Sequence, residues 1–305
     1  MNILITRHDK IGDFITALPM CKVLKEQTEH TVVMLVSKVN VPLASALDFI
    51  DEVIEYREDT KILLKEIKSY HFDVSISAYI DMPLGKLLFR AGIPLRIAPA
   101  TKIAQIFFNK RVKQRRSLVE KREFEYNLDL LKVFDANLNL VFKRPLLEPV
   151  GSIKSNNFII FHPGFGGSSE GNLTLDDYLK LAKKASESID IVFTFGPDDE
   201  VSKAYIKKHL DFSADIRDDF KDLMAFTVFI ASSTLFVSTS TGPMHLAGLT
   251  NTPTLSFFGA TLFASAKRWG TISDAALQHH FTVAENYDEV LYTRIEQHLM
   301  DIIHA

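Results

Sequence analysis

Short runs of apolar and β-branched residues alternate with longer segments of helical periodicity along the whole chain. The first run, Ile3–Thr6, is followed by an apolar helical segment at Phe14–Glu26, and the same order then repeats. Buried strands that alternate with helices are typical of βαβ units, whose strands lie parallel in one sheet. The pattern therefore predicts an α/β protein.

The alternation falls into two sets of elements. In the first half we expect strands at Ile3–Thr6, Thr31–Val36, Glu52–Tyr56, Asp73–Ser77 and Leu95–Ala98, and helices at Phe14–Glu26, Val41–Leu47, Lys61–Ser69, Pro83–Ala91 and Phe124–Phe134. In the second half we expect strands at Phe158–His162, Ile189–Phe195, Leu235–Ser238 and Thr254–Phe258, and helices at Leu175–Ser186, Asp199–Leu210, Phe220–Ala231, Pro243–Leu249 and Glu289–Ile303.

A change of composition separates the two sets. The stretch Lys143–Asn157 contains two prolines and ends in polar residues, as linkers do. A length of 305 residues also suits about two domains. We therefore expect one domain at 1–150 and a second at 151–288. The last helix, at 289–305, fits the surface of either domain.

Composition excludes several classes of protein. Lys and Arg number 35 and Asp and Glu 38, so the net charge of −3 favours no nucleic-acid partner. The uncharged tract 223–266 is broken by Gly242-Pro243 and Pro253, so we expect it to form the packed interior of a domain. The single cysteine, Cys21, has apolar neighbours and is expected to be buried, in a protein of a reducing compartment.

The first predicted strand runs into segment 7–13, which ends in Gly12-Asp13. Asp13 is thereby placed at a helix N-terminus near the carboxyl edge of the sheet, where open α/β sheets bind ligands. Two roles fit Asp13: a helix cap, or a general base that takes a proton from a substrate hydroxyl. In the second role Arg7, His8 and Lys10 supply positive charge beside it.

A glycine-rich turn follows the first strand of the second half, at His162-Pro-Gly-Phe-Gly-Gly-Ser168-Ser169. Backbone N–H groups in such a turn bind phosphate. The run lacks the ending of a P-loop and the spacing of a dinucleotide fingerprint. A phosphate site that includes Ser168 and Ser169 and a plain turn both fit these residues.

A strand that ends in hydroxyl residues leads into a helix within Ser238–Ala247. Proline fits the first turn of a helix, and the free N–H groups and positive dipole end of that turn bind a diphosphate. Capping by the hydroxyls alone is the simpler alternative. The residues that would face a diphosphate are Thr241, Gly242, Pro243, Met244 and His245.

Between these two turns, the run Gly196-Pro-Asp-Asp-Glu200 ends another predicted strand. Glu200 is a candidate to accept hydrogen bonds from a ribose diol, as an acidic residue does in dinucleotide sites, and helix capping is the alternative. Asp-x-Asp and His-x-x-x-His patterns are absent from the sequence. We therefore expect no dedicated metal site.

One segment, Thr101–Arg122, is strongly basic. It contains eight Lys or Arg residues against Glu120 alone, together with Ile103, Ile106 and two phenylalanines. A basic segment with apolar side chains suits the phosphates of an anionic lipid or lipid-linked sugar at a membrane surface. A solvated basic loop without a partner fits the same residues.

Taken in chain order, these segments resemble glycosyltransferase family 9, the lipopolysaccharide heptosyltransferases. The resemblance covers nearly the whole chain, and Glu123–Leu128 is similar to that family's helix after the acceptor loop. The matching motifs are Arg7–Asp13 with Leu18-Pro19, His162-Pro163-Gly164 with Gly166-Gly167-Ser168, Gly196-Pro197 with Glu200, and above all Ser240–Ala247 with Pro253-Thr254 and Phe258-Gly259.

The resemblance implies a GT-B architecture, in which two Rossmann-like domains face a central cleft and the last helix crosses back to the first domain. It implies inverting, metal-independent transfer of heptose from the donor ADP-heptose, without a cofactor, to a Kdo or heptose residue of the lipid A core oligosaccharide. The expected enzyme is cytoplasmic and peripheral, in contact with the anionic inner membrane at its cytoplasmic face.

The resemblance also implies roles for individual residues. Asp13 deprotonates the acceptor hydroxyl. The donor diphosphate is held by Thr241 and Gly242 with the helix that they start, and Ser168 and Ser169 add hydrogen-bond donors. Glu200 and Ser240 lie beside the ribose and the donor sugar, and the acceptor is bound by Arg7, Lys10, Arg115 and Arg116.

Two positions depart from the family pattern. Ser240 stands where these enzymes commonly have an aspartate, and Glu170-Gly171-Asn172 stands where a basic residue is usual, which leaves Lys10 or Arg268 to compensate. Three alternatives stay open: transfer from another nucleotide sugar, a nucleotide-sugar epimerase, and a nucleotide-sugar-binding protein without catalysis.

Overall fold

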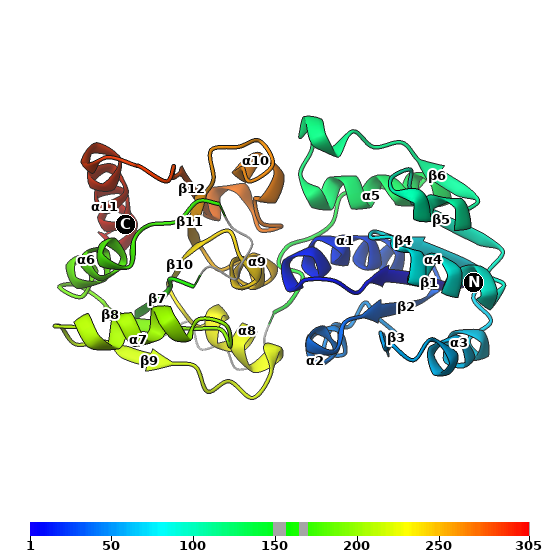
Figure 1. Cartoon of the computed structure of the whole chain (residues 1–305), viewed down its shortest axis with the longest axis horizontal. Helices are drawn as coiled ribbons and strands as arrows, with labels where there is room; N and C mark the ends of the chain where they lie inside the picture. Colours follow the sequence, from blue (N-terminus) through cyan, green and yellow to red (C-terminus); the bar gives the residue numbers. More distant parts are fainter. Residues whose placement is uncertain (149–156, 165–169, 305) are drawn as a thin grey trace. The chain divides into compact units, whose positions relative to one another are not determined.

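The computed structural model describes residues 1–148, 157–164 and 170–304. The chain divides into two compact units, Met1–Lys143 and Arg144–Ala305 (Figure 1). Each unit contains one six-stranded sheet, and all the strand pairs within both sheets are parallel. The predicted α/β class is confirmed.

The sheet of the first unit has the strand order β3-β2-β1-β4-β5-β6. Its strands are β1 (Asn2–Arg7), β2 (Thr31–Val36), β3 (Glu52–Glu55), β4 (Val74–Ser77), β5 (Leu95–Pro99) and β6 (Lys110–Val112). Its helices are α1 (Ile11–Gln27), α2 (Val41–Ala44), α3 (Thr60–Ser69), α4 (Met82–Ala91) and α5 (Glu123–Phe134), with 3-10 turns η1 (Lys38–Asn40), η2 (Ile103–Phe107) and η3 (Arg116–Leu118).

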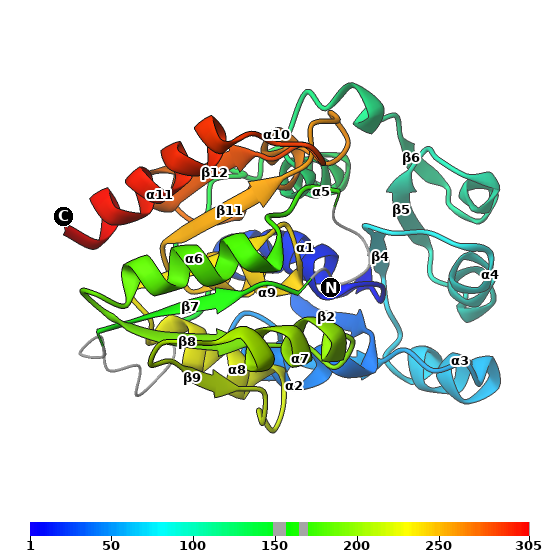
Figure 2. The same cartoon turned by 60° about the vertical axis from the view of Figure 1, so that its left-hand side comes forward.

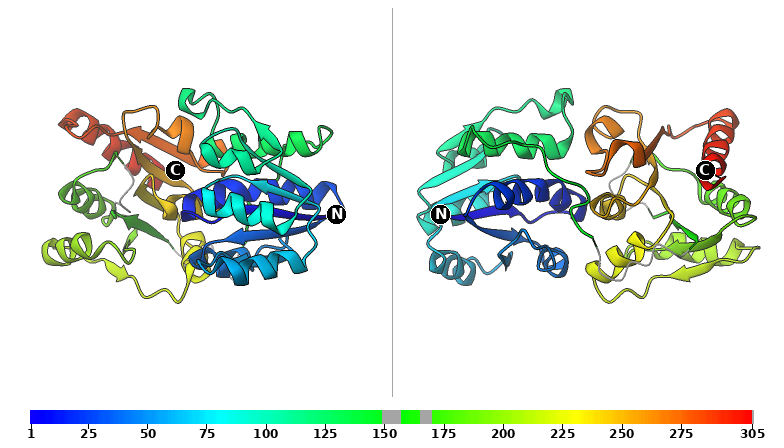
Figure 3. Two further views of the ribbon diagram at one scale, coloured as in Figure 1. Left: turned by 45° about the vertical axis from the view of Figure 1, so that its right-hand side comes forward. Right: turned by 180° about the vertical axis from the view of Figure 1, so that it is seen from behind.

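Helices cover both faces of this sheet, with α1 and α5 packed together on one face and α3, α4 and η2 on the other (Figure 3). Side chains are buried all around α1, including Cys21, because the helix lies between the sheet and α5. Cys21 is thus buried as predicted.

The second unit repeats this plan with the strand order β12-β11-β10-β7-β8-β9 (Figure 2). Its strands are β7 (Phe158–His162), β8 (Asp190–Thr194), β9 (Asp215–Arg217), β10 (Leu235–Thr239), β11 (Thr254–Phe258) and β12 (Gln278–Thr282). Its helices are α6 (Leu175–Ala185), α7 (Glu200–His209), α8 (Leu223–Ala231), α9 (Gly242–Leu249), α10 (Ala266–Trp269) and α11 (Glu289–His304), with the 3-10 turn η4 (Ala275–Leu277).

The last helix, α11, packs against α6 within the second unit (Figure 1). Its buried side chains, Tyr292, Ile295 and Leu299, are part of the core cluster that also contains residues of β7, β8 and α6. These contacts lie within the second unit, and the packing toward the first domain that the resemblance implies stays a prediction. The apolar side chains of α11 pack on the surface formed by α6 and the adjacent sheet.

Residues 144–147 belong to the second unit. The expected boundary at residue 150 lies outside the described residues, and the division falls between Lys143 and Arg144, at the start of the predicted linker. Arg144 donates to the carbonyl of Ile272, and the N–H groups of Leu146 and Leu147 donate to that of Leu249. These contacts attach residues 144–147 to the second unit.

Both sheets have a topological switch point, where the chain leaves one side of the first strand and later returns on the other. The switch lies between β1 and β4 in the first unit and between β7 and β10 in the second. Ligands of open α/β sheets bind beyond the carboxyl ends of the strands at such points.

Within the described part of the chain, no helix combines the length and the apolar character needed to cross a membrane.

Candidate active site

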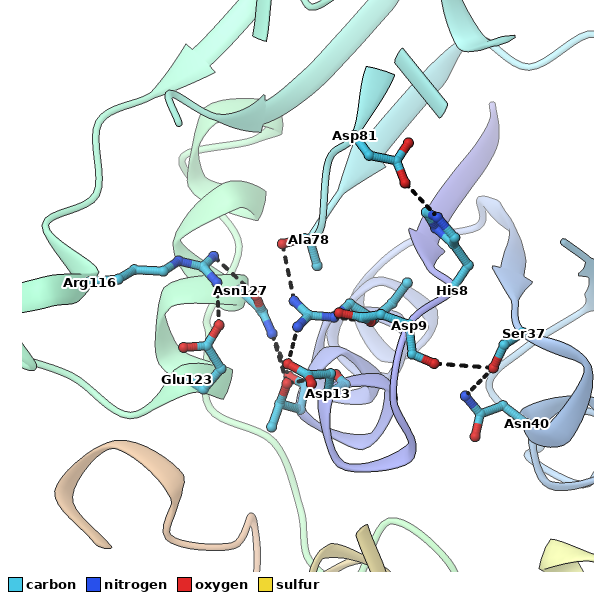
Figure 4. Close-up of polar contacts among 12 residues, drawn as sticks. His8, Asp9, Asp13, Ser37, Asn40, Ala78, Asp81, Arg116, Glu123 and Asn127 are labelled. Carbon is cyan, nitrogen blue, oxygen red and sulfur yellow. Dashed lines mark hydrogen bonds and ion pairs between the residues drawn. The ribbon is translucent and has the colours of Figure 1, made fainter. Parts of the chain in front are cut away.

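Asp13 lies in the first turn of α1, just beyond the carboxyl end of β1. Its carboxylate accepts a charged hydrogen bond from Nη2 of Arg7, the last residue of β1 (Figure 4). The N-cap of α1 is Lys10, so the helix begins before Asp13, which is not its cap. The structure therefore leaves the Asp13 carboxylate at the switch point with a side-chain partner.

Arg7 is 4% exposed, and each of its three guanidinium nitrogens donates a hydrogen bond within the first unit. Nε donates to Oδ1 of Asp9 at 2.8 Å, Nη1 donates to the carbonyl of Ala78 at 3.1 Å, and Nη2 donates to Asp13. Ala78 directly follows β4, so Arg7 connects the two strands of the switch point. Arg7 is expected at the acceptor, and in this structure it also holds Asp13.

The charges around Asp13 act in opposite directions. Burial raises the pKa of the Asp13 carboxyl above its usual value, the positive charges of Arg7 and Lys10 lower it, and the negative charges of Asp9 and Glu123 raise it again. The net effect is a raised pKa, which makes the carboxylate a stronger base than an exposed aspartate.

His8 is expected to supply positive charge, and the structure contradicts this. Its ring stacks on Tyr56 with centroids 4.1 Å apart, and its Nε2 lies 3.2 Å from a carboxylate oxygen of Asp81. Burial lowers the pKa of His8 despite the neighbouring Asp81, so the imidazole is neutral at pH 7. The positive charge beside Asp13 comes from Arg7 and Lys10.

Two residues of α5 belong to this site and carry no role in the sequence prediction. Glu123 is buried and pairs with Arg116, and Asn127 donates from Nδ2 to the carbonyl and the hydroxyl of Thr16, at 3.1 Å each. The sequence indicates their role only by their spacing: the two polar residues lie four positions apart, on the same helix face as apolar residues.

The basic segment is more structured than a loop, since it contains η2, β6 and η3. Arg115 is exposed, as acceptor binding requires. Arg116 turns inward and bonds to Gln114, Glu123 and Asn127. Its guanidinium is thus committed to the protein interior rather than to the surface, because the buried Glu123 carboxylate needs a partner.

The predicted diphosphate site lies at the carboxyl end of β10, where Thr241 is the N-cap of α9. The Thr241 hydroxyl donates to the carbonyl of Thr239 at 3.4 Å and makes no capping hydrogen bond. The Thr241 hydroxyl therefore does not cap α9. The positive end of α9 keeps its capacity to bind an anion.

The next two side chains of α9, Met244 and His245, are both buried. The Met244 side chain is fully buried, so only its backbone N–H is suited to an anion. His245 is also buried, its Nδ1 has no hydrogen-bond partner, and burial lowers its pKa to about 4. A neutral imidazole therefore stands in the first turn of α9 at neutral pH.

His162, at the end of β7, is held in the same neutral form. Its Nδ1 lies 3.0 Å from the hydroxyl of Thr194, and burial lowers its pKa to about 4 although Nε2 lies 3.8 Å from Asp199. Asp199 in turn accepts the N–H of Gly196 at 2.8 Å. A Cβ at Gly164 would lie 2.1 Å from Oδ2 of Asp199, so any other residue at 164 would force the Asp199 side chain to move.

Residues 170–172, which depart from the family pattern, pack on the carboxyl end of β11. Glu170 accepts the Thr261 hydroxyl at 2.8 Å, and Asn172 accepts the hydroxyl of Tyr178 at 2.7 Å. A Cβ at Gly171 would lie 2.3 Å from the carbonyl carbon of Phe258. The segment is thereby fixed beside the end of β11 by close backbone packing.

The remaining predicted site residues differ in exposure. Ser168 and Ser169 lie outside the described residues. Glu200, expected at the ribose, is the first residue of α7; its side chain is 76% exposed and 3.5 Å from Lys203. The N–H of Ser240 donates to the carbonyl of Phe257 at 3.0 Å. The structure thus brings Arg7 and Asp13 together in one unit, and Ser240 and residues 241–245 in the other.

The described residues contain no group of three His, Cys, Asp or Glu side chains arranged to hold a metal ion.

Residues 89–298 match the model of glycosyltransferase family 9, described as heptosyltransferase. A Haemophilus influenzae protein described as a glycosyltransferase is 37% identical over 300 residues, which cover 89% of this chain and 86% of that protein.

Solved structures with similar folds include two Escherichia coli enzymes. ADP-heptose lipopolysaccharide heptosyltransferase II has a TM-score of 0.82 at 17% identity and covers 100% of this chain and 99% of its own. Heptosyltransferase WaaC with ADP has a TM-score of 0.80 at 14% identity and covers 99% and 100%. A UDP-GlcNAc 2-epimerase from Neisseria meningitidis is less similar, with a TM-score of 0.51 at 12% identity, covering 100% and 92%.

The two parallel six-stranded sheets match the GT-B architecture of the heptosyltransferase structures. The family match spans more than half of the chain, and the relative at 37% identity supports the same assignment. This protein is therefore a glycosyltransferase enzyme that belongs to glycosyltransferase family 9, the heptosyltransferase family.

Proposed function

We propose that the protein transfers heptose from ADP-heptose to a sugar of the lipopolysaccharide inner core, with inversion at the anomeric carbon. The observation that carries the proposal is the half-buried Asp13 carboxylate, held by Arg7 at the switch point of the first sheet with a raised pKa. A base of this kind suits the removal of a proton from a sugar hydroxyl.

In the proposed reaction Asp13 takes the proton of the acceptor hydroxyl as its oxygen attacks the anomeric carbon. The new C–O bond forms on the face opposite the leaving group, and the bond between the anomeric carbon and the phosphate oxygen breaks. ADP leaves with that electron pair. Arg7 keeps the carboxylate oriented throughout, because its guanidinium is fixed by Ala78 and Asp9.

The donor is assigned to the second unit. The N-terminal turn of α9, residues 241–245, would hold the diphosphate and stabilise its developing charge, with help from Ser168 and Ser169. Glu200 would bind the ribose and Ser240 the donor sugar. Support comes from related folds, since one E. coli structure is described with ADP and another with ADP-2-deoxy-2-fluoro heptose. No step in this scheme requires a metal ion or a cofactor.

The acceptor is assigned to the first unit, through Lys10 and Arg115 at its surface. Arg7 and Arg116 would act behind them, as their described contacts are internal. Contact with an anionic membrane at its cytoplasmic face is supported by Ile103 and Ile106, which are 77% and 63% exposed within the basic segment.

Calorimetric titration with ADP, ADP-heptose, UDP-sugars and GDP-sugars, in EDTA and again with magnesium, tests this proposal. We expect metal-independent preference for ADP and ADP-heptose, followed by transfer to deacylated core oligosaccharide. Preference for UDP or GDP would indicate that the donor is another nucleotide sugar. This is the second candidate, because Ser240 stands where the family commonly has an aspartate. Conversion of a nucleotide sugar without an acceptor would favour an epimerase, and no nucleotide binding would contradict catalysis.

A further inference from the structure

A chain of polar contacts connects the basic segment to the helix that carries Asp13 (Figure 4). Nη2 of Arg116 donates to Oδ1 of Asn127 at 3.3 Å, and Nδ2 of Asn127 donates to the carbonyl and the hydroxyl oxygen of Thr16. The Thr16 hydroxyl then donates to the backbone carbonyl of Asp13 at 2.7 Å. The first turn of α1 is thereby tied to α5 and η3.

The members of this chain are buried, which is costly for polar groups. Asn127 and Thr16 are buried, and Glu123, which pairs with Nη1 of Arg116, is 2% exposed. A buried ion pair adds little to stability compared with well-packed apolar side chains. Packing of α5 on α1 alone therefore gives no reason for these residue types.

We propose that Arg116, Glu123 and Asn127 are positioning residues for Asp13. Asn127 fixes the backbone of the turn that carries the carboxylate, and the Arg116–Glu123 pair sets the charge that Asp13 meets from α5. The proposal rests on the proposed function only for the role of Asp13 as a base.

Charged groups face Asp13 from each surrounding element. Arg7 comes from β1, Asp9 and Lys10 from the turn before α1, and Glu123 from α5. Arg7 and Lys10 favour the ionised carboxylate, whereas Asp9 and Glu123 disfavour it. Removal of the Glu123 charge should therefore lower the pKa of Asp13 and weaken it as a base.

The chain offers a matched control on the same two segments. Lys121 donates from Nζ to both carboxylate oxygens of Asp129, at 2.8 and 2.7 Å, and thus also connects the basic segment to α5. Lys121 is exposed and Asp129 is half-buried, and neither is among the groups that shift the pKa of Asp13. Substitution of Asp129 therefore removes a carboxylate and an ion pair without a change in the surroundings of Asp13.

The test is a carbon-13 NMR titration of the Asp13 carboxyl in the full chain, with the resonance assigned by its loss in D13N. For E123Q we expect the midpoint to fall by about half a pH unit or more, and for D129N we expect the wild-type midpoint. The double variant R116Q/E123Q leaves no unpaired buried charge and should also titrate below wild type. Equal midpoints in wild type and in both Glu123 variants would overturn the proposal.

Kinetics supply a second readout. Loss of the Asn127 amide in N127A should lower kcat about tenfold and leave the affinity for ADP unchanged, because the turn that carries the base loses its tie. An unchanged kcat would contradict the positioning role of Asn127. Failure of the wild-type enzyme to transfer any sugar would contradict the proposed function instead, and the NMR titration would still decide the charge effect.

Discussion

The two switch points have the same topology but differ in charge. Beyond β1 and β4 charged side chains are paired, with Arg7 between Asp9 and Asp13. Beyond β7 and β10 the side chains are hydroxyls and glycines, and burial holds His162 and His245 neutral. One edge thus carries the Asp13 carboxylate with its raised pKa, and the other carries the positive end of the α9 helix dipole.

The strand order therefore marks only where a ligand binds, whereas the chemistry depends on a few residues after each strand. A proton acceptor needs a raised pKa and a fixed orientation, which burial and Arg7 provide for Asp13. A diphosphate already carries negative charge, so the positive N-terminal end of α9 suits it.

Asp13→Asn should have the largest effect. We expect kcat to fall by about 10²–10⁴-fold, because the amide accepts no proton, while the affinity for ADP stays within about twofold. Turnover and calorimetric titration measure the two quantities. Asp48→Asn, an exposed substitution in the same unit, is the control. A parallel loss of ADP affinity in D13N would place the donor in the first unit and break the comparison.

His245→Gln should remove a pH dependence from the second unit. The pKa of His245 is about 4 in the folded protein and near 6.5 in the unfolded chain, so protonation favours unfolding. The contribution of neutral His245 to the free energy of unfolding is complete above pH 6.5 and is lost as the pH falls toward 4. Over that window the wild-type free energy of unfolding should fall by about 3 kcal/mol more than that of H245Q, measured by urea titration.

His209→Gln, on the exposed face of α7, controls for the removal of a histidine as such. Identical pH dependence in wild type and H245Q would contradict a buried neutral His245. Asp13 has the reverse sign, since its raised pKa makes protonation favour the folded state. The two switch points should therefore respond to acid in opposite directions.

Gly164→Ala should disturb the donor site through packing. The new Cβ would lie 2.1 Å from Asp199, which must move and release the N–H of Gly196. We expect a loss of about 1–3 kcal/mol in stability and about tenfold in ADP affinity. D199A removes the clash, so G164A/D199A should be less damaged than the sum of the single variants. Strict additivity would show that the two residues do not interact.

Substitution of surface cations in the basic segment should have the smallest effect. Lys113→Ala and Arg115→Ala are each expected to raise the acceptor KM about two- to fivefold at low salt, with less effect at high salt. Lys184→Ala in the second unit is the matched control, since this lysine is also exposed. An acceptor KM that is insensitive to both substitutions and to salt would leave the segment without a role in binding.

The sequence predicts the interior of both sheets well and their edges poorly. The central strands are runs of buried β-branched and apolar residues, so their pattern is clear. The three strands absent from the prediction, β6, β9 and β12, each lie at the edge of a sheet. Edge strands are short and polar because one side faces solvent, so Lys110–Val112 resembles part of a basic loop.

The site could be predicted only where its residues are close in the sequence. Arg7 and Asp13 are six residues apart, at the end of β1 and in the first turn of α1, so their contact follows from a strand that leads directly into a helix. Asn127 reaches Thr16 across 111 positions, and this contact depends on how α5 packs on α1. The inward direction of Arg116 is missed for the same reason, because its partner Glu123 is buried only in the folded unit.

The most direct test of the division between the two regions is amide hydrogen exchange with and without ADP. We expect ADP to slow exchange at residues 195–199 and 240–247, at the carboxyl ends of β8 and β10, and to leave residues 7–16 unchanged. Protection confined to residues 7–16, or no protection at either switch point, would contradict the account.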